Sequence, residues 1–576
     1  MRNSDSGGRT LSVGGNAQNE YQFRLYRSLF PSGLGTCAFA HPCGAGVPGV
    51  CRVSANSLTS VSFFSSRATV KHWRNLTVLV FGGGLQILFQ RIFGDNRMRR
   101  KTIRVLCASI FLLATISILS KGPNKTSAAS PSLPNRAAQS SSAKSIRHVL
   151  IVSIDGMKPE SYTEPDAHGL KVPTLREMAR NGASSDGVQS VMPTVTYPSH
   201  TSMVTGANPL AHGVFTNPAW DPLNQNYGGY RWYTEDVRVP TLWQLAQQAG
   251  LRTALIHWPV TAGAQADFNI PEYWRASIPE DMKLVRALST PGVFEKISAQ
   301  YPTFKTDVPP LDLTDAVWTD AACYAIENEK PNLLLLHLAM VDHWEHEKGP
   351  FSPEANAATE TADAQIARVI SSAKKAGAWQ DTVLVVLSDH GFAPISQEMR
   401  PGVLIQQKGL ITLDPKGRIT DWKATEIIDG GSAYIYLKDP NDDATRTSLH
   451  NIFDPLAGAE GSGIRRIATH DEIVAMGGDP NAFLALEAAD GTSFAFGYTG
   501  ELKSPSSRSG THGYFPDRPQ MRASMIFFGP AIGIGKIDHA RLIDVAPTVA
   551  AWLNLKFDKT DGSALSIPMN AAFGTK

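Results

Sequence analysis

Four short apolar segments most restrict what this chain can fold into. They are rich in leucine or β-branched residues and lack the alternation of polar residues expected of a half-exposed strand. Their bounds are His148–Ile154, Pro331–Val341, Thr382–Leu387 and Ala523–Phe528. Segments with helical periodicity lie among them, at Thr174–Ala183, Thr241–Gly250, Ala355–Ala378 and Ile543–Leu553. This arrangement predicts an α/β fold in which helices cover both faces of a doubly wound parallel sheet, a three-layer α/β/α sandwich.

Carboxylates and histidines follow three of the four apolar segments. These are Asp155, the pair Asp342 and His346, and the adjacent Asp389 and His390. Ligands of open α/β sheets bind at the carboxyl ends of the strands, so we expect these side chains to converge. A last candidate is His512, between Thr511 and Gly513. Oxygen and nitrogen ligands without thiolates suit zinc or a similar divalent ion.

Each of these residues also has an ordinary alternative. An aspartate that ends a buried strand is often a helix or turn cap. Asp342 and His346 are four apart, which fits an exposed helical pair as well as two ligands on one face. His512 alone reads as a solvated loop histidine. The joint occurrence in one chain favours metal ligation.

A candidate nucleophile, Thr196, lies in the run Met192–His200, between the first ligand and the later ones. A threonine hydroxyl ionises far above neutral pH, and metal coordination is one of the few ways to activate it. These residues together predict a two-metal hydrolase.

Charge and cysteine content exclude other classes. The net charge of +2 gives no case for a nucleic-acid polymer as a partner. Of five cysteines, only Cys323 lies beyond the amino-terminal segments, so we exclude a disulfide framework and a cysteine-based zinc site in the folded part.

The amino-terminal part predicts export. Residues 98–128 combine a basic start with the apolar run Val105–Leu119 and read as a signal peptide or signal anchor. We expect translation to begin at Met98, with residues 1–97 a mis-assigned start; the alternative is a long tail before an uncleaved anchor. Residues 129–147 read as a linker, and 148–576 as the catalytic domain, with an insertion or cap at 395–510. The protein is then periplasmic or extracellular, or membrane-anchored only through its amino-terminal segment.

Residues from about 148 to 570 resemble the nucleotide pyrophosphatase/phosphodiesterase family of the alkaline phosphatase superfamily. The shared pieces are the Asp155-Gly strand end, Pro-Thr-Val-Thr-Tyr-Pro-Ser-His, Val204-Thr-Gly206, His212-Gly213, Asp342 to His346 with Gly349-Pro350, Ser388-Asp-His-Gly391 and Gly510-Thr-His-Gly513. The family usually has Phe-Pro-Asn-His after its nucleophile, where this chain has Tyr-Pro-Ser-His. The family's Glu-Pro-Asp is replaced here by Met-Val-Asp342, which changes the surroundings of that ligand.

The resemblance implies a fold of the alkaline phosphatase type and two zinc ions. One ion would be held by Asp342, His346 and His512, and the other by Asp155, Asp389, His390 and the oxygen of Thr196. It also implies that Thr196 attacks phosphorus to form a phospho-threonine intermediate, and that water then hydrolyses it. The N–H of Tyr197 and the side chain of Asn217 would hold a non-bridging oxygen.

The expected substrate is a small phosphodiester or nucleotide. No arginine stands beside Thr196 in the sequence, and a neutral Asn217 in place of a cation suits a diester better than the more highly charged monoester. Tyr197 either stacks on a flat substrate group or packs in the core. The segment from Trp220 to Trp232 is either a substrate-facing loop or a packed surface turn.

Other functions remain open at the level of sequence. A phosphonate hydrolase also uses a metal-bound threonine, and a phosphomonoesterase of the same superfamily is a further alternative. A sulfatase would need a cysteine or serine in its modification motif, which Cys323 lacks. From a different class, the chain reads as an exported metal-binding module without catalysis.

Overall fold

The computed structural model describes residues 145–226, 229–275, 278–304, 308–310 and 314–573, and two short strands nearer the amino terminus. These are β1 (Val80–Phe81) and β2 (Gly84–Leu85), an antiparallel pair in a unit spanning Met1–Gln139. All other described residues belong to a second compact unit, Ser140–Lys576. Among the described residues, no helix is long and apolar enough to span a membrane. The export segment expected at 98–128 lies outside them, as do the linker up to residue 144 and nearly all of 1–97.

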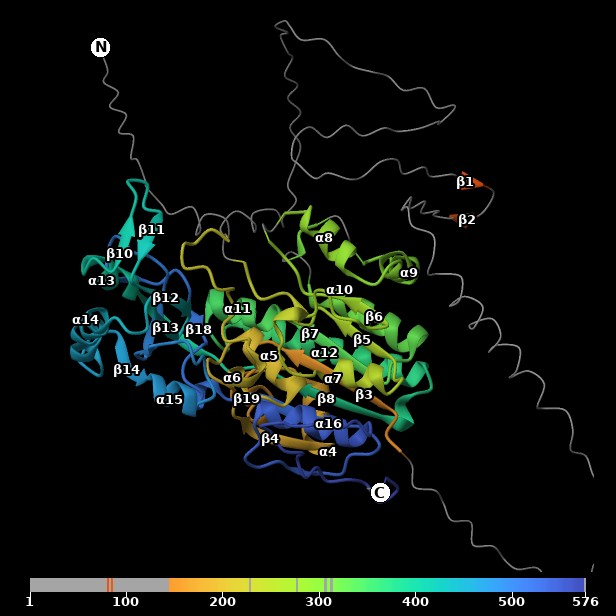
Figure 1. The fold of residues 1–576 in the computed structure, drawn as a ribbon. Helices are drawn as coiled ribbons and strands as arrows, with labels where there is room; N and C mark the ends of the chain where they lie inside the picture. The colour runs from red at the N-terminus through yellow and green to blue at the C-terminus, as the bar shows by residue number, and fades with distance from the viewer. Residues whose placement is uncertain are drawn as a thin grey trace, which may run out of the picture. The chain divides into compact units, whose positions relative to one another are not determined.

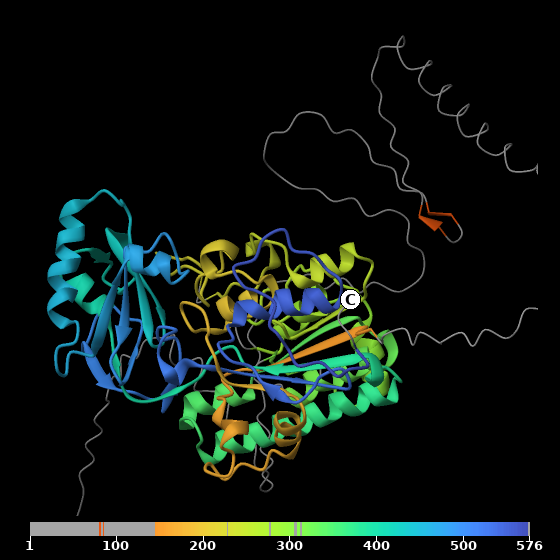
Figure 2. The same ribbon diagram turned by 90° about the horizontal axis from the view of Figure 1, so that it is seen from below.

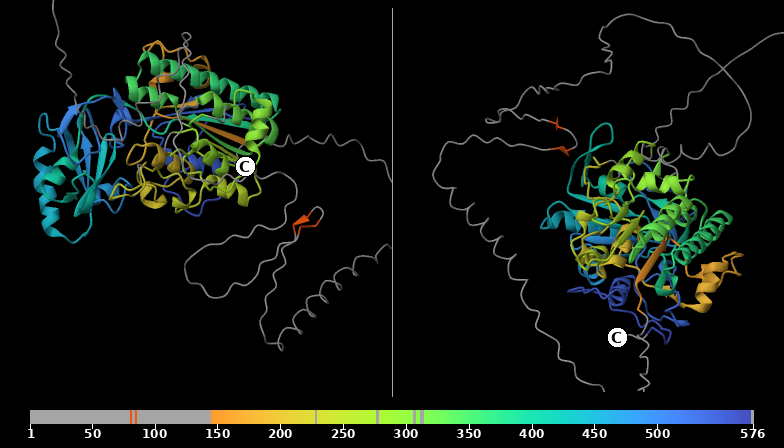
Figure 3. Two further views of the ribbon diagram at one scale, coloured as in Figure 1. Left: turned by 90° about the horizontal axis from the view of Figure 1, so that it is seen from above. Right: turned by 90° about the vertical axis from the view of Figure 1, so that its right-hand side faces the viewer.

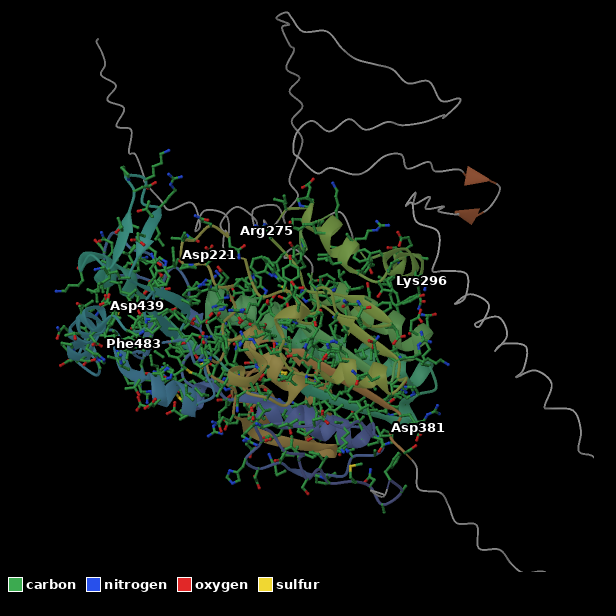
Figure 4. All side chains as sticks on the ribbon, in the orientation of Figure 1. Asp221, Arg275, Lys296, Asp381, Asp439 and Phe483 are labelled. Atoms are coloured by element: carbon green, nitrogen blue, oxygen red, sulfur yellow. The ribbon has the colours of Figure 1, made fainter. Side chains whose placement is uncertain are left out.

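An eight-stranded sheet forms the centre of the second unit (Figure 1), with the order β20-β4-β19-β8-β3-β7-β5-β6. In that order the strands are Gly535–Lys536, Ala183–Val188, Ala523–Phe528, Thr382–Leu387, His148–Ile154, Leu333–Leu338, Thr253–Ile256 and Phe268–Ile270. β3 lies between β7 and β8 and is parallel to both. Asp381, labelled in Figure 4, marks the edge at which β8 begins, opposite to the edge at which these parallel strands end.

Helices cover both faces of this sheet, as Figure 2 shows. One layer joins α3, α4, α9, α10 and α12, and the other joins α5, α6, α7 and α16. The first set spans Glu160–Thr163, Pro173–Asn181, Val293–Gln300, Asp315–Tyr324 and Pro353–Lys375. The second set spans Thr196–Thr205, Pro209–His212, Leu242–Gln248 and Val545–Trp552. A further helix, α8 (Asp281–Leu288), follows β6.

Local chemistry explains where several of these helices stop and start. The Ser352 side chain accepts a hydrogen bond from the Ala355 N–H and caps the start of α12. Gly250 and Gly377 follow α7 and α12 with φ of 73° and 70°, the left-handed conformation that ends a helix at low cost for glycine. β3, β7 and β8 are buried almost throughout, so the sheet interior is the main core.

The predicted α/β fold is confirmed, with one difference in strand direction. Ala523–Phe528 is predicted as a parallel strand, but β19 runs antiparallel to both β4 and β8. A segment that is apolar on both faces reports burial in the sheet and not the direction of the chain. β19 is buried on both sides, and its sequence therefore carries the same signal as its parallel neighbours.

The chain between β8 and β19 builds a second lobe beside the sandwich, which Figure 3 shows in teal and blue. Its main sheet has the order β12-β13-β15-β14, at Ala424–Asp429, Ser432–Leu437, Leu484–Ala488 and Ile464–Thr469. A second sheet joins β9, β16, β17 and β18, at Ala393–Met399, Gly491–Phe494, Lys503–Pro505 and Gly510–Thr511. The hairpin β10–β11 (Ile411–Leu413, Ile419–Trp422) and the helices α13, α14 and α15 (Pro401–Gln407, Asp443–Phe453, His470–Ala475) complete it. This lobe has a hydrophobic cluster of its own.

Candidate active site

The carboxyl ends of three parallel strands bring the candidate ligands together. Asp155 directly follows β3, and Asp389 and His390 come shortly after β8. α11 (Met340–Lys348) begins two residues after β7 and carries Asp342 and His346. Because they are four apart in this helix, the two side chains lie on one face, and that face points into the site.

His512 reaches the same place from the second lobe. It follows β18, which pairs with β9. Its Nε2 lies 3.4 Å from Asp342 Oδ1, and Nε2 of His346 lies 3.5 Å from the same oxygen. The structure therefore assembles the first expected ligand set, Asp342, His346 and His512, around one carboxylate oxygen.

The second set assembles around His390. Its Nε2 lies 3.3 Å from Asp155 Oδ1 and 3.2 Å from Asp389 Oδ2. The two sets adjoin, because the His390 ring stacks on the His512 ring at 3.7 Å with 11° between the planes. Asp342, His390 and His512 also form a candidate metal group of their own.

Backbone carbonyls orient all three imidazoles. Nδ1 of His346 lies 3.0 Å from Gly510 O, Nδ1 of His390 lies 3.2 Å from Gly391 O, and Nδ1 of His512 lies 3.1 Å from Thr194 O. An imidazole whose Nδ1 proton is donated to a carbonyl keeps a lone pair on Nε2, which is the form that binds a metal.

Electrostatics and unsatisfied atoms show that these residues fit divalent cations. Burial, and then the charge of Asp342, raises the pKa of Asp155 to about 7; burial, and then Asp389, raises the pKa of Asp342 to about 7. Burial lowers the pKa of His512 to about 4 and that of His390 well below its ordinary value, so both rings are neutral at pH 7. Buried polar atoms without a hydrogen-bond partner face each other here: Asp155 Oδ1, Asp342 Oδ1, Asp389 Oδ2 and His390 Nε2. Clustered carboxylates with neutral imidazoles are a donor set for zinc.

Thr196 is the first residue of α5 and is 9% exposed. The sequence alone does not predict this helix, because its residues are largely polar and include Pro198. His200, one turn further along, places Nδ1 2.8 Å from Thr196 O and 3.5 Å from Asp389 Oδ2. These contacts tie the helix start to the second ligand set, and the positive end of the helix dipole favours an anion near Thr196.

Asn217 lies beside Tyr197, as the resemblance implies, but with a different hydrogen bond. The Tyr197 N–H donates to Asn217 Oδ1 at 2.8 Å. The asparagine amide group Nδ2 is then the one directed away from this bond. The Asn217 N–H is in turn held by the carboxylate of Asp429, from the second lobe.

Tyr197 is buried, and its ring packs edge-on against Tyr230 at 5.5 Å. Its hydroxyl donates to Glu272 Oε1 at 3.0 Å. In the segment Trp220–Trp232, Tyr230 and Trp232 both contact Trp274, whereas Trp220 is 44% exposed and contacts Trp422 and Tyr436 of the second lobe. The segment is therefore packed at its end and open at its start.

Three residues near the site escape the sequence reasoning: His337, Glu272 and Arg508. His337 interrupts the apolar run of β7, which is the one signal that could have identified it. Burial alone would lower its pKa, but its bonds to Asp155 and Glu272 outweigh burial and raise that pKa well above the ordinary value. The Arg508 charge, after burial, lowers the pKa of His346.

Known proteins share this fold. Murine ectonucleotide pyrophosphatase/phosphodiesterase 5, solved as an inactive variant in complex with AMP, superposes with a TM-score of 0.53 and 20% identity, over 73% of this chain and 100% of that chain. The fold is that of the alkaline phosphatase superfamily. A family model described as type I phosphodiesterase / nucleotide pyrophosphatase matches residues 149–515. The chain belongs to this family, which confirms the resemblance.

The similarity to individual relatives is low. The human ectonucleotide pyrophosphatase/phosphodiesterase family member 1 is 25% identical over 248 residues, 42% of this chain and 23% of the relative. Ectonucleotide pyrophosphatase/phosphodiesterase 1 of Saccharomyces cerevisiae is 27% identical over 312 residues, 50% of this chain and 39% of the relative. The chain thus spans about a quarter to two fifths of the length of these two relatives.

Proposed function

We propose that this protein is a two-metal phosphodiesterase or nucleotide pyrophosphatase that uses Thr196 as its nucleophile. The observation that carries the proposal is the pair of adjoining ligand sets, with buried unpaired atoms facing each other, beside the start of α5. Family membership supports a phosphoester as the substrate.

Asp342, His346 and His512 would hold one ion, and Asp155, Asp389, His390 and the Thr196 hydroxyl the other. When bound, the ions supply a lower pKa for the coordinated hydroxyl and positive charge for the attacking and leaving oxygens. Zinc is the expected metal, because the ligands are imidazole nitrogens and carboxylate oxygens without carbonyl-rich coordination.

Thr196 attacks the phosphorus atom through Oγ1, and its proton leaves to solvent. The bond from phosphorus to the leaving oxygen breaks, and the phosphoryl half of the substrate stays on Thr196 as an ester. Water then attacks the same phosphorus, the bond to Oγ1 breaks, and the threonine hydroxyl is restored. Each displacement is in line, so the water enters from the side that the leaving group vacated.

Asn217 is the better placed of the two expected oxyanion donors. Its Oδ1 already accepts the Tyr197 N–H, which leaves Nδ2 to donate to a non-bridging oxygen as charge moves onto it. The Tyr197 N–H would then orient the Asn217 amide, whereas the resemblance implies that it donates to the substrate oxygen itself.

A nucleotide-containing diester is the proposed substrate class. The related murine protein binds AMP, and the family description names nucleotide pyrophosphatases. A neutral Asn217 suits the single negative charge of a diester. We propose export for the same protein, because residues 98–128 read as a signal segment and both relatives are named ectonucleotide enzymes.

One observation favours a second candidate, a monoesterase or phosphonate hydrolase. Arg508 lies near enough to the first ligand set that its charge acts on Asp342, His346 and His512. A cation at this position would stabilise the additional negative charge of a monoester or phosphonate.

The test compares kcat/KM of the zinc-loaded full chain on thymidine 5′-p-nitrophenyl phosphate, bis-p-nitrophenyl phosphate and p-nitrophenyl phosphate. The proposal predicts preference for the nucleoside diester, and loss of turnover in Thr196→Ala. Preference for the monoester, reduced in Arg508→Gln, would establish the second candidate instead. No turnover of any ester, with zinc bound, would support a non-catalytic metal-binding module.

A further inference from the structure

A buried chain of hydrogen bonds connects Tyr197 to the metal-ligand candidate Asp155. The Tyr197 hydroxyl donates to Glu272 Oε1 at 3.0 Å, and Glu272 Oε2 lies 3.2 Å from Nδ1 of His337. The other ring nitrogen, Nε2, lies 3.1 Å from Asp155 Oδ2. All four side chains are buried, and the connected residues come from four separate segments of the chain.

The His337 ring is held so that it donates in both directions. Its Nε2 faces a carboxylate, and its Nδ1 faces a carboxylate and the carbonyl oxygen of His257 at 3.1 Å. Since these neighbours are acceptors, both nitrogens carry a proton. The His257 carbonyl is placed by a backbone with φ of 52°, and the His257 ring stacks on Trp318 at 4.3 Å. A left-handed φ in a residue other than glycine costs free energy, and here it directs a carbonyl at His337.

The chain of hydrogen bonds determines which oxygen Asp155 can offer to a metal. Oδ2 is engaged by His337, whereas Oδ1 has no hydrogen-bond partner and lies 3.3 Å from His390 Nε2. At its other end the chain fixes the Tyr197 ring, whose backbone N–H orients Asn217. One hydrogen-bond network thereby holds both the metal-ligand candidate Asp155 and Tyr197, the residue next to the proposed nucleophile.

A third metal ion is the other reading of these residues, because His257, Glu272 and His337 have ligand atoms within 4.8 Å of one another. The hydrogen bonds argue against it. The two ligand sets of the active site contain buried atoms without partners, whereas none of the described buried atoms that lack a partner belongs to His257, Glu272 or His337. We infer that Glu272 and His337 are positioning residues, which couple the orientation of Tyr197 to that of Asp155; the inference rests on the proposed function for its catalytic consequence.

Metal and nucleotide binding test this inference without turnover. Zinc affinity of the full chain is measured by competition with a chromophoric chelator, and AMP affinity by calorimetry on the zinc-loaded protein. Glu272→Gln keeps the shape of the side chain and removes its charge. This variant and His337→Gln are expected to lower the affinity for one of the two zinc ions by about 10- to 100-fold. Tyr197→Phe is expected to weaken AMP binding by several-fold and to change zinc affinity in the same direction.

Matched controls separate positioning from stability. His148→Gln changes a histidine at the opposite end of β3, where Nδ1 contacts Pro331 O, and Glu426→Gln changes a buried carboxyl of the second lobe. Both controls should keep zinc and AMP affinity within about twofold of the wild type. The double variant Tyr197→Phe with His337→Gln should lose less zinc affinity than the product of the two single losses, since either change interrupts the same chain.

Two results would overturn the inference. One is unchanged zinc and AMP affinity in folded Glu272→Gln. The other is a wild type that binds three zinc ions and loses the third in that variant, which would establish the metal reading. The proposed function can fail separately: absence of phosphodiester turnover, with the predicted zinc and AMP effects, would leave the positioning role standing.

Discussion

At the scale of single residues, the site depends on which atom each side chain leaves uncommitted. Nδ1 of His346, His390 and His512 is hydrogen-bonded to backbone carbonyls, and His337 is hydrogen-bonded to one oxygen of Asp155. The remaining nitrogens and oxygens face each other. Outer hydrogen bonds orient the ligands of metal sites in this way, which supports the proposed metal site here.

Thr196 supplies the first prediction. Thr196→Ala removes the attacking oxygen and one proposed metal ligand, so kcat on the nucleoside diester should fall by at least about 10³-fold. Thr205→Ala, at the last residue of the same helix, is the control. The Thr205 hydroxyl donates to Thr201 O and accepts from the Ala207 N–H, neither of which belongs to the site, so turnover should stay within about threefold. Equal activity of Thr196→Ala and the wild type would rule out this nucleophile.

Asn217 supplies the second. Asn217→Ala removes the proposed oxyanion donor, and kcat should fall by about 10²- to 10³-fold. AMP affinity should change far less, because the donor acts on charge that develops during the reaction. If AMP affinity and kcat fell by the same factor, Asn217 would be a ground-state binding residue.

Sequence reasoning reaches the strand-end residues and not those behind them. Asp155, Asp389 and His390 are visible because an apolar run marks the strand that positions them. The hydrogen-bonded residues Glu272 and His337 are 65 positions apart in the sequence, and His337 and Asp155 are 182 positions apart. No local pattern reports such pairing, so the network becomes apparent only in the folded chain.

At the scale of elements, close contact between the end of β12 and the segment that follows β18 positions His512. Gly513 has φ of 86°, and a Cβ added there would lie 1.8 Å from Asp429 O. That oxygen ends β12, the edge strand of the lobe's main sheet. The glycine therefore permits His512 and the Asn217-binding carboxylate of Asp429 to approach the same site.

Gly513→Ala is the third prediction. The side chain would force β12 away from His512, so we expect destabilisation by more than about 2 kcal/mol and loss of most zinc binding. Gly500 is the matched control, with φ of 90° and nothing within 4 Å of the added Cβ. Gly500→Ala should cost about 1 kcal/mol of backbone strain and leave zinc affinity unchanged. Equal unfolding free energies for the two variants, from chemical denaturation, would refute the contact.

Periodicity predicts the long helices and the central strands, but it misses strands farther from the centre of the sheet. β3, β8 and β19 have the bounds expected from their apolar runs. β4 reads Ala-Ser-Ser-Asp-Gly-Val and is not predicted, because its polar residues carry no burial signal. It is a strand because it pairs with β19 and β20. Tertiary pairing here outweighs local preference.

At the scale of the whole molecule, metal binding and stability are linked through pH. In the metal-free protein, burial and neighbouring carboxylates raise the pKa of Asp155 and Asp342 from 3.8 to about 7. The folded state then favours the protonated carboxyls. Their contribution to stability is full below about pH 4 and is lost as the pH rises through about 7.

The fourth prediction follows from the direction of this pH dependence. Zinc replaces the protons, so the difference in Tm between zinc-loaded and chelator-treated protein should grow from about pH 5 to about pH 8. Differential scanning calorimetry measures it. Asp342→Asn should flatten the pH dependence of the metal-free protein and reduce the zinc effect. A difference in Tm that stays constant over this range would contradict the assignment of these carboxylates.

The stereochemical course at phosphorus tests the central claim most directly. A substrate with a chiral phosphorothioate diester is hydrolysed in ¹⁸O-water, and ³¹P NMR identifies the configuration of the product. Attack by Thr196 followed by attack by water comprises two in-line displacements, so the account predicts overall retention. Overall inversion would show that water attacks the substrate directly, and it would contradict a covalent intermediate on Thr196.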